Sequence, residues 1–220
     1  MLTMIKKAAV GAALFTGLAG TSAQAASLVN GGFEDPLISV AIFSVPSSGQ
    51  LTGWSVVGGN IEIIKNTYWQ ASEGTQSIDL NGVQAGAIQQ SITGLVTGAK
   101  YSVSFDLSAN PLGGANVKTV AVNAGSSTQT FTFDRNQAGY GFQNMLWATH
   151  SLMFTASGAS ELLRFTDVSG GGAASGPALD NVTVQRVSAP VPVPAAGLLG
   201  LSGAALLSLL RITRRKTGAA

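Results

Sequence analysis

The groups of this 220-residue chain that could do acid–base chemistry are ten carboxylates and one histidine. Glu62, Glu73 and Glu161 could approach one another in the fold, and a facing pair of carboxylates is what glycoside hydrolysis requires. Nothing in their spacing singles out a pair. A glycoside hydrolase is therefore the least favoured of the functions considered below, and we expect no enzyme activity.

The single histidine, His150, stands in an apparent strand. The chain has no cysteine and no Gly-x-Ser-x-Gly motif, so the sequence offers His150 no nucleophilic partner of a known kind. A catalytic metal site built on several histidines is excluded by their number. We expect His150 to be structural.

Large aromatic residues in segments rich in Asn, Gln and Gly suggest a different chemistry, the binding of sugar. An exposed ring can stack on a pyranose while neighbouring amides bond its hydroxyl groups, and the candidates are Tyr68, Trp69 and Trp147. The alternative is that these rings are buried, as large aromatic rings usually are. Trp54 opens an apolar strand and is expected in the core.

The elements that would position these residues are predicted to be strands. Alternation of apolar and polar residues is clearest in 101–107, where it is typical of a half-buried strand. Gly, Pro, Asn and Ser clusters separate the strands, and helix-favouring stretches are rare. The pattern predicts an all-β, two-sheet sandwich of jelly-roll type. The other strands are expected near 53–57, 61–65, 76–80, 87–92, 117–123, 129–133, 149–155, 162–168 and 179–187.

The first 25 residues are typical of a secretory signal. Lys6 and Lys7 precede an apolar stretch, and the small residues Ala23 and Ala25 predict cleavage after Ala25. A first transmembrane helix is the alternative, but the apolar stretch is short and ends in small residues.

The C-terminal segment 188–220 contains three unlike parts. A Pro-rich motif, Val191, Pro192, Val193, Pro194 and Ala195, is followed by an apolar run to Leu210 and by the basic residues Arg211, Arg214, Arg215 and Lys216. The 16 residues from Ala195 to Leu210 would form about 24 Å of helix against about 30 Å of bilayer hydrocarbon. The basic cluster resists crossing a membrane. A permanent membrane anchor and a processed sorting tail are both consistent with these residues.

Without its two ends, the chain has a different charge. Six Lys and Arg against ten Asp and Glu give the domain 26–187 a net charge of −4, although the whole chain is at +2. A basic surface for nucleic acid is therefore not expected. An exported domain of this length without cysteine must be held together by its core.

The C-terminal segment resembles the sorting tail of bacterial PEP-CTERM proteins, in the Val-Pro-x-Pro-Ala variant of its motif. Val193 stands where the commonest form has Glu. The resemblance implies recognition and processing by an exosortase-type membrane enzyme. It also implies that the domain is held at the membrane only transiently, before it reaches the cell surface or the extracellular matrix.

The domain between the ends resembles the choice-of-anchor C domain, a relative of the DUF642 proteins. The residues that carry this resemblance are 28–34, Gly53-Trp54, 74–82, 89–95, 101–111 and 176–182, in that order. It implies a galactose-binding-like jelly roll. In related carbohydrate-binding jelly rolls a Glu and an Asp at the places of Glu34 and Asp180 help to hold a structural Ca²⁺, an ion that prefers oxygen ligands. The alternative is that Glu34 accepts backbone N–H groups in a turn and Asp180 caps a loop.

Two functions remain after the hydrolase. The first is an exported surface or matrix protein that acts in display, adhesion or association with extracellular polysaccharide. The second is a dedicated carbohydrate-binding module for one glycan. An exposed aromatic platform beside polar side chains favours the second, and aromatic residues that are all buried favour the first.

Overall fold

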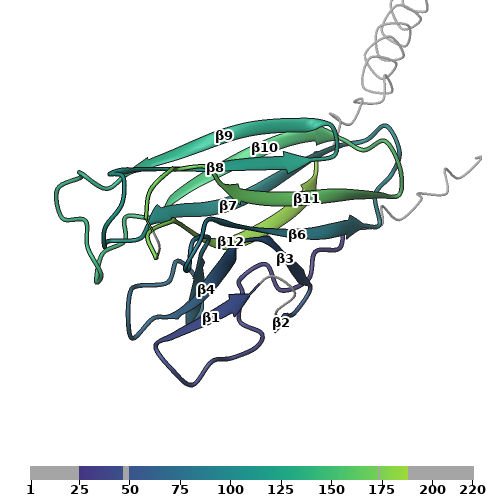
Figure 1. Ribbon diagram of the computed structural model, residues 1–220. Coiled ribbons are helices and arrows are strands. Elements are labelled where there is room, and N and C mark those ends of the chain that lie inside the picture. The colour runs from purple at the N-terminus through teal and green to yellow at the C-terminus, as the bar shows by residue number, and fades with distance from the viewer. Residues whose placement is uncertain (1–24, 47–49, 173, 188–220) are drawn as a thin grey trace, which may run out of the picture.

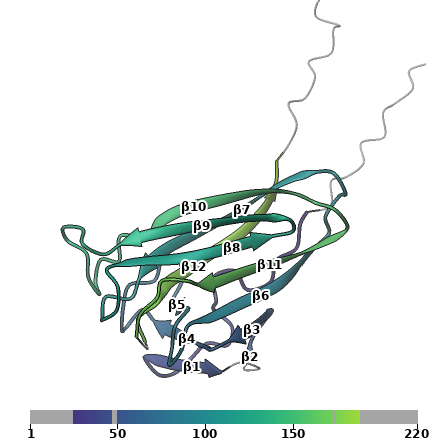
Figure 2. The same cartoon turned by 45° about the horizontal axis from the view of Figure 1, so that its top comes forward.

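The computed structural model describes residues 25–46, 50–172 and 174–187. All of the strands in this part of the chain pair antiparallel and form two six-stranded sheets. Figures 1 and 2 show the arrangement of the strands in space. Sheet I has the order β1 (Ile42–Pro46), β4 (Asn60–Lys65), β5 (Gln76–Asp79), β12 (Pro177–Arg186), β7 (Lys100–Ala109) and β10 (Ala148–Thr155). Sheet II has the order β2 (Gln50–Leu51), β3 (Trp54–Gly58), β6 (Gly86–Thr93), β11 (Ser160–Asp167), β8 (Val117–Ala124) and β9 (Ser127–Asp134).

The predicted two-sheet sandwich is confirmed, and all ten predicted strands are present. Two strands were missed, β1 and β2. Within the described ranges there is no helix, and therefore none long and apolar enough to cross a membrane. The predicted signal segment up to residue 24 and the predicted C-terminal helix lie outside the described residues.

The core between the sheets is built from alternate residues along the strands, whose side chains point inward from both sheets. Its aromatic residues pack edge to face, as Phe105 does on Phe131 and Phe165, with ring centroids 5.1 and 5.2 Å apart. Trp54 lies in this core, as predicted, and is 5 % exposed. His150 packs against Phe105 and Phe131, which gives its ring a structural position.

A second, smaller apolar cluster lies on the outer face of sheet I. Register places Ile64, Ser77 and Ala178 on the face of the sheet that points away from the main core, because Ile63, Ile78 and Leu179 point into it. Trp69 and Met145 cover this face and are fully buried. They come from the β4–β5 and β9–β10 connections, so two loops far apart in the sequence share one apolar cluster.

Candidate functional site

The two loops on the outer face of sheet I are joined through Gln70. Its backbone N–H donates to Phe142 O at 2.8 Å, its side-chain Oε1 accepts from Met145 N at 3.1 Å, and its carbonyl accepts from Trp147 Nε1 at 3.0 Å. Below this junction, Ser108 Oγ donates to Met145 O. These bonds fix the β9–β10 loop against the β4–β5 loop and against the sheet.

Three aromatic rings are partly exposed where the loops meet. Tyr68, Phe142 and Trp147 pack on the buried cluster with one side and remain accessible on the other. The rings of Tyr68 and Phe142 are 5.4 Å apart and nearly perpendicular. The side chains of Gln70 and Gln143 are exposed beside them. We call these five residues, Tyr68, Gln70, Phe142, Gln143 and Trp147, the aromatic surface.

Trp69 does not belong to this surface. Trp69 was a candidate for an exposed ring, with burial as the alternative, and it is fully buried, with its Nε1 donating to Ser77 Oγ at 2.8 Å. The reason is that the β4–β5 loop lies over the outer face of sheet I, where Trp69 packs in one cluster with Ile64 and Met145. Trp69 therefore supports Tyr68, with ring centroids 6.1 Å apart, rather than offering a ring to a ligand.

A polar layer lies under the end of the β4–β5 loop. Asp180 Oδ2 accepts from the backbone N–H groups of Ser72 and Glu73, and Asp106 Oδ2 accepts from Ser72 Oγ at 2.6 Å. Asp106 and Asp180 are register partners on β7 and β12, and a bulge after Asp180 directs Asn181 Nδ2 onto Asp106 Oδ2. Burial raises the pKa of Asp180 to about 7, against the hydrogen bonds that favour its ionised form.

Glu34 holds the same end of the loop, two residues further along the chain. Glu34 Oε1 accepts from the N–H groups of Thr75 and Gln76 at 2.7 and 2.9 Å, and Oε2 accepts from Thr75 Oγ1. Gly74, which precedes Thr75, has a φ of +60°, and a Cβ there would fall 2.3 Å from Glu34 Oε1, so this approach requires glycine.

The predicted calcium ligands therefore act on one segment, 72–76. All four carboxylate oxygens of Glu34 and Asp180 already accept N–H or O–H donors. Within the described ranges no group of three or more His, Asp or Glu side chains could hold a metal ion. As arranged, both residues anchor backbone N–H groups of this segment, which is the alternative given with the calcium prediction.

The structure places Glu62 and Glu161, two of the three candidate carboxylates, on different sheets. Glu62 lies on β4 of sheet I. Glu161 lies on β11 of sheet II, and its Oε1 accepts hydrogen bonds from the backbone N–H and the Oγ of Ser157. The register partner of Glu62 is Asp79, a carboxylate that the sequence analysis did not single out. Asp79 is fully buried and bonded to Asn81, Asn110 and Gly176, so no substrate can reach it.

A buried lysine ties together the loops at one end of the sandwich. Lys118 has no exposed surface, and its Nζ donates to Gly113 O at 3.3 Å and to Ser175 O. It thereby joins the β7–β8 loop to the segment that precedes β12. Burial lowers the pKa of Lys118, an effect to which Arg135 adds and which Asp79 and Asp167 oppose. The Lys118 ammonium group thus links two loops at this end of the sandwich through their carbonyl groups.

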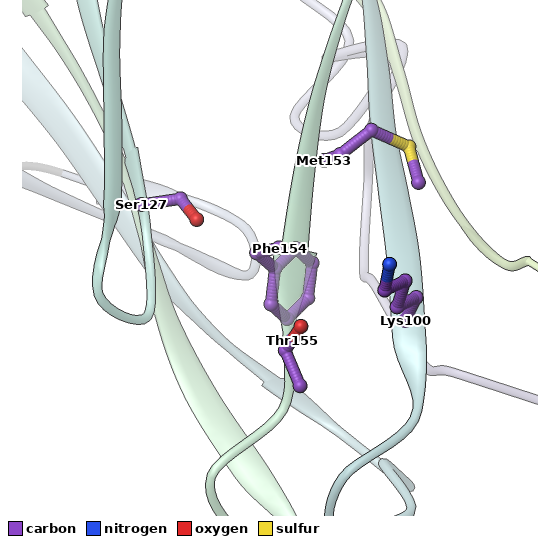
Figure 3. Close-up of a pocket in the computed structure, with 5 residues that line it drawn as sticks. All are labelled: Lys100, Ser127, Met153, Phe154 and Thr155. Carbon is purple, nitrogen blue, oxygen red and sulfur yellow. The ribbon is translucent and has the colours of Figure 1, made fainter.

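A shallow pocket of about 310 Å³ lies at another edge of the sandwich. Its lining residues come from β7, β9 and β10, as Figure 3 shows; they are Lys100, Ser127, Met153, Phe154 and Thr155. The ring of Phe154 is stacked on Tyr101, with centroids 5.6 Å apart. The pocket thus offers a ligand one ammonium group and two hydroxyl groups, without a free aromatic face.

Comparison with known proteins gives a family and several loosely similar folds. A family model described as "Protein of unknown function (DUF642)" matches residues 26–185. Halomucin from Haloquadratum walsbyi is 31 % identical over 184 residues, which are 81 % of this chain and 2 % of halomucin. This chain therefore spans a very small part of that relative.

Solved structures that resemble the sandwich include carbohydrate-binding modules. TmCBM61, solved in complex with β-1,4-galactotriose, has a TM-score of 0.47 and 14 % identity over 73 % of this chain and 97 % of that one. A family 35 module from Clostridium thermocellum has a TM-score of 0.41 and 12 % identity over 66 % of this chain and 98 % of that one.

Proposed function

The chain belongs to the DUF642 family, and we propose that its sandwich is a non-catalytic module that binds extracellular polysaccharide through the aromatic surface. The observation that carries this proposal is the placement of Tyr68, Phe142 and Trp147, which are partly exposed and held in place around Gln70. A ring fixed in this way loses little conformational freedom when it binds a sugar.

The polar groups beside the rings suit the same ligand. A pyranose presents C–H groups on its faces, which can stack on an aromatic ring, and hydroxyl groups around its rim. The amide of Gln143 can both donate to and accept from such hydroxyls, and the amide NH₂ of Gln70 can donate to them while its Oε1 is bonded to Met145 N. The carboxylates that hold the β4–β5 loop from the sheet, Asp106 and Asp180, are at most 6 % exposed, so they position the loop and do not touch the ligand.

Binding of neutral polysaccharides tests this function. In affinity electrophoresis of the purified chain through gels containing β-1,4-galactan, xylan or β-glucan, we expect at least one polymer to retard the protein. Trp147→Ala and Tyr68→Ala should each weaken that binding about tenfold, equivalent to about 1.4 kcal/mol, because each removes a stacking face.

The matched control is Phe43→Ala. Phe43 is 47 % exposed on the edge strand β1, outside the aromatic surface, so its loss should leave the binding unchanged. If none of the three polymers retards the protein, or if Phe43→Ala weakens binding as much as Trp147→Ala, the aromatic surface is not the glycan site. The first function, display or adhesion without a dedicated glycan site, would then be favoured.

Export and sorting of this domain form the second part of the proposal. The signal residues 1–25 and the motif at 191–195 support export, transient attachment to the membrane, and processing by an exosortase-type enzyme. Intact-mass analysis of surface and medium fractions, with and without that enzyme, is expected to give a mature chain that begins at Ala26 and ends near Pro194. A chain that retains Arg211 to Lys216 in every fraction would indicate a permanent anchor instead.

A further inference from the structure

A continuous row of polar side chains crosses the outer face of sheet II. Arg164 on β11 is the register partner of Gln89 on β6 and of Asn123 on β8. The row continues at both ends, because Ser55 on β3 pairs with Gln89 and Thr128 on β9 pairs with Asn123. Five strands about 4.8 Å apart give the row a length of about 19 Å.

The adjacent row shows which way these side chains point. Val56, Ile88, Phe165 and Val122 are also register partners and all lie in the buried core. Since successive side chains of a strand point to opposite faces, the Arg164 row faces outward. Its members are partly or fully exposed.

Arg164 is the cation at the centre of this row. Its Nε donates to Thr166 Oγ1 at 3.2 Å, which holds the guanidinium along its own strand. Among the described residues its Nη groups have no hydrogen-bond acceptor and no carboxylate partner, although arginine forms bidentate pairs with carboxylates readily. The guanidinium can therefore accept an external anion without first breaking an ion pair.

The surroundings of Arg164 contain little negative charge. Among the described side chains that alternate onto this face, the one carboxylate is Asp134, six residues along β9 from Thr128 and about 20 Å away at about 3.3 Å per residue. Across the sheet, Thr166 has Ala87 and Ala121 as register partners, so the side chains in the row next to Arg164 are small. The other members of the row carry amide or hydroxyl groups, and Asn123 Nδ2 donates to Thr128 Oγ1 at 2.6 Å.

We propose that this row binds an extended strand of acidic polysaccharide, with a sugar carboxylate paired to the Arg164 guanidinium and neighbouring hydroxyls bonded by Gln89, Asn123, Ser55 and Thr128. One cation among uncharged polar groups suits a sugar acid, in which a carboxylate is accompanied by the hydroxyl groups of its ring. The domain itself carries a net charge of −4, which disfavours a densely charged polymer such as nucleic acid.

This site is separate from the aromatic surface. The row lies on the outer face of sheet II, whereas the aromatic surface lies on loops over the outer face of sheet I. A polysaccharide with both neutral and acidic stretches could therefore be held on both faces, and the domain would then link strands of a matrix. The proposed site for acidic polysaccharide does not depend on the proposed site for neutral polysaccharide, and each can be tested alone.

Titration calorimetry of the purified chain with polygalacturonate and with alginate tests the proposal. Wild-type protein should bind at least one of them, and Arg164→Gln should weaken that binding about tenfold or more, because a charge-assisted pair is lost. Reducing the polymer's carboxylates to alcohols should weaken the binding to wild-type protein by a similar factor. Arg164→Lys should recover only part of it, because lysine lacks the bidentate fork.

Two controls separate this site from general charge and from the aromatic surface. Arg186→Gln removes one exposed cation at the end of β12 and should leave the affinity within about twofold. Trp147→Ala should bind the acidic polymer as wild-type protein does. The proposal is overturned if neither polymer binds, if Arg164→Gln binds as tightly as wild-type protein, or if poly-glutamate binds equally well and with the same loss in Arg164→Gln.

Discussion

Replacement of Lys118 by methionine is expected to lower the free energy of unfolding by about 3 kcal/mol. Methionine can fill much of the space, but it leaves Ser175 O without its buried donor and removes the cation near Asp79 and Asp167, whereas Gly113 O keeps the hydrogen bond from Arg135 Nη1 at 2.7 Å. Each buried acceptor left unpaired costs about 1 to 3 kcal/mol. Urea unfolding followed by tryptophan fluorescence measures the change.

The matched control for this substitution is Lys100→Met. Lys100 is an exposed lysine at the start of β7, so its replacement should change the free energy of unfolding by less than about 0.5 kcal/mol. Equal stability of Lys118→Met and Lys100→Met would show that the buried ammonium does not hold this end of the sandwich together.

Between pH 4 and pH 7 the stability of the protein is expected to fall. Burial raises the pKa of Asp79 and of Asp180 to about 7, whereas an unfolded Asp titrates near 4. The folded state therefore binds more protons than the unfolded state in this window. The contribution of these two groups is complete below about pH 4 and is lost as the pH rises through 7, at up to about 4 kcal/mol per group.

Two groups modify this pH dependence in opposite directions. Burial also raises the pKa of Glu62, which adds to the fall in stability, whereas burial lowers the pKa of His150, which opposes it. The informative measurement is therefore the slope of the unfolding free energy against pH in variants. Asp180→Asn should flatten this slope relative to wild-type protein. A wild-type stability that rises steadily from pH 4 to 7 in parallel with that of Asp180→Asn would contradict the assignment.

The fold could be predicted largely because alternation is a local signal. In β7 the inward residues Tyr101, Val103, Phe105 and Leu107 alternate with polar ones, and this strand was found. β1 was missed because Ile42–Pro46 shows little alternation and ends at a proline, and β2 because two residues carry no period.

The site could be predicted only in part, because it depends on contacts between distant loops. Tyr68 and Trp147 were identified from their local composition, but only the folded chain shows that Gln70 joins the loops and that Trp69 is buried between them and the sheet. Lys118 did leave a signal that we overlooked. Lys118, Val120 and Val122 are alternate residues of β8, so their side chains point to the same, inward face.

The central claim, that the aromatic surface is a polysaccharide site, is tested most directly by NMR chemical-shift mapping. Adding oligosaccharide fragments of the polymer that retards the protein to ¹⁵N-labelled chain should produce saturable shifts in the backbone amides of Tyr68, Gln70 and Phe142 and in the indole N–H of Trp147. Saturable shifts confined to other parts of the sandwich, with these four signals unmoved, would contradict the account.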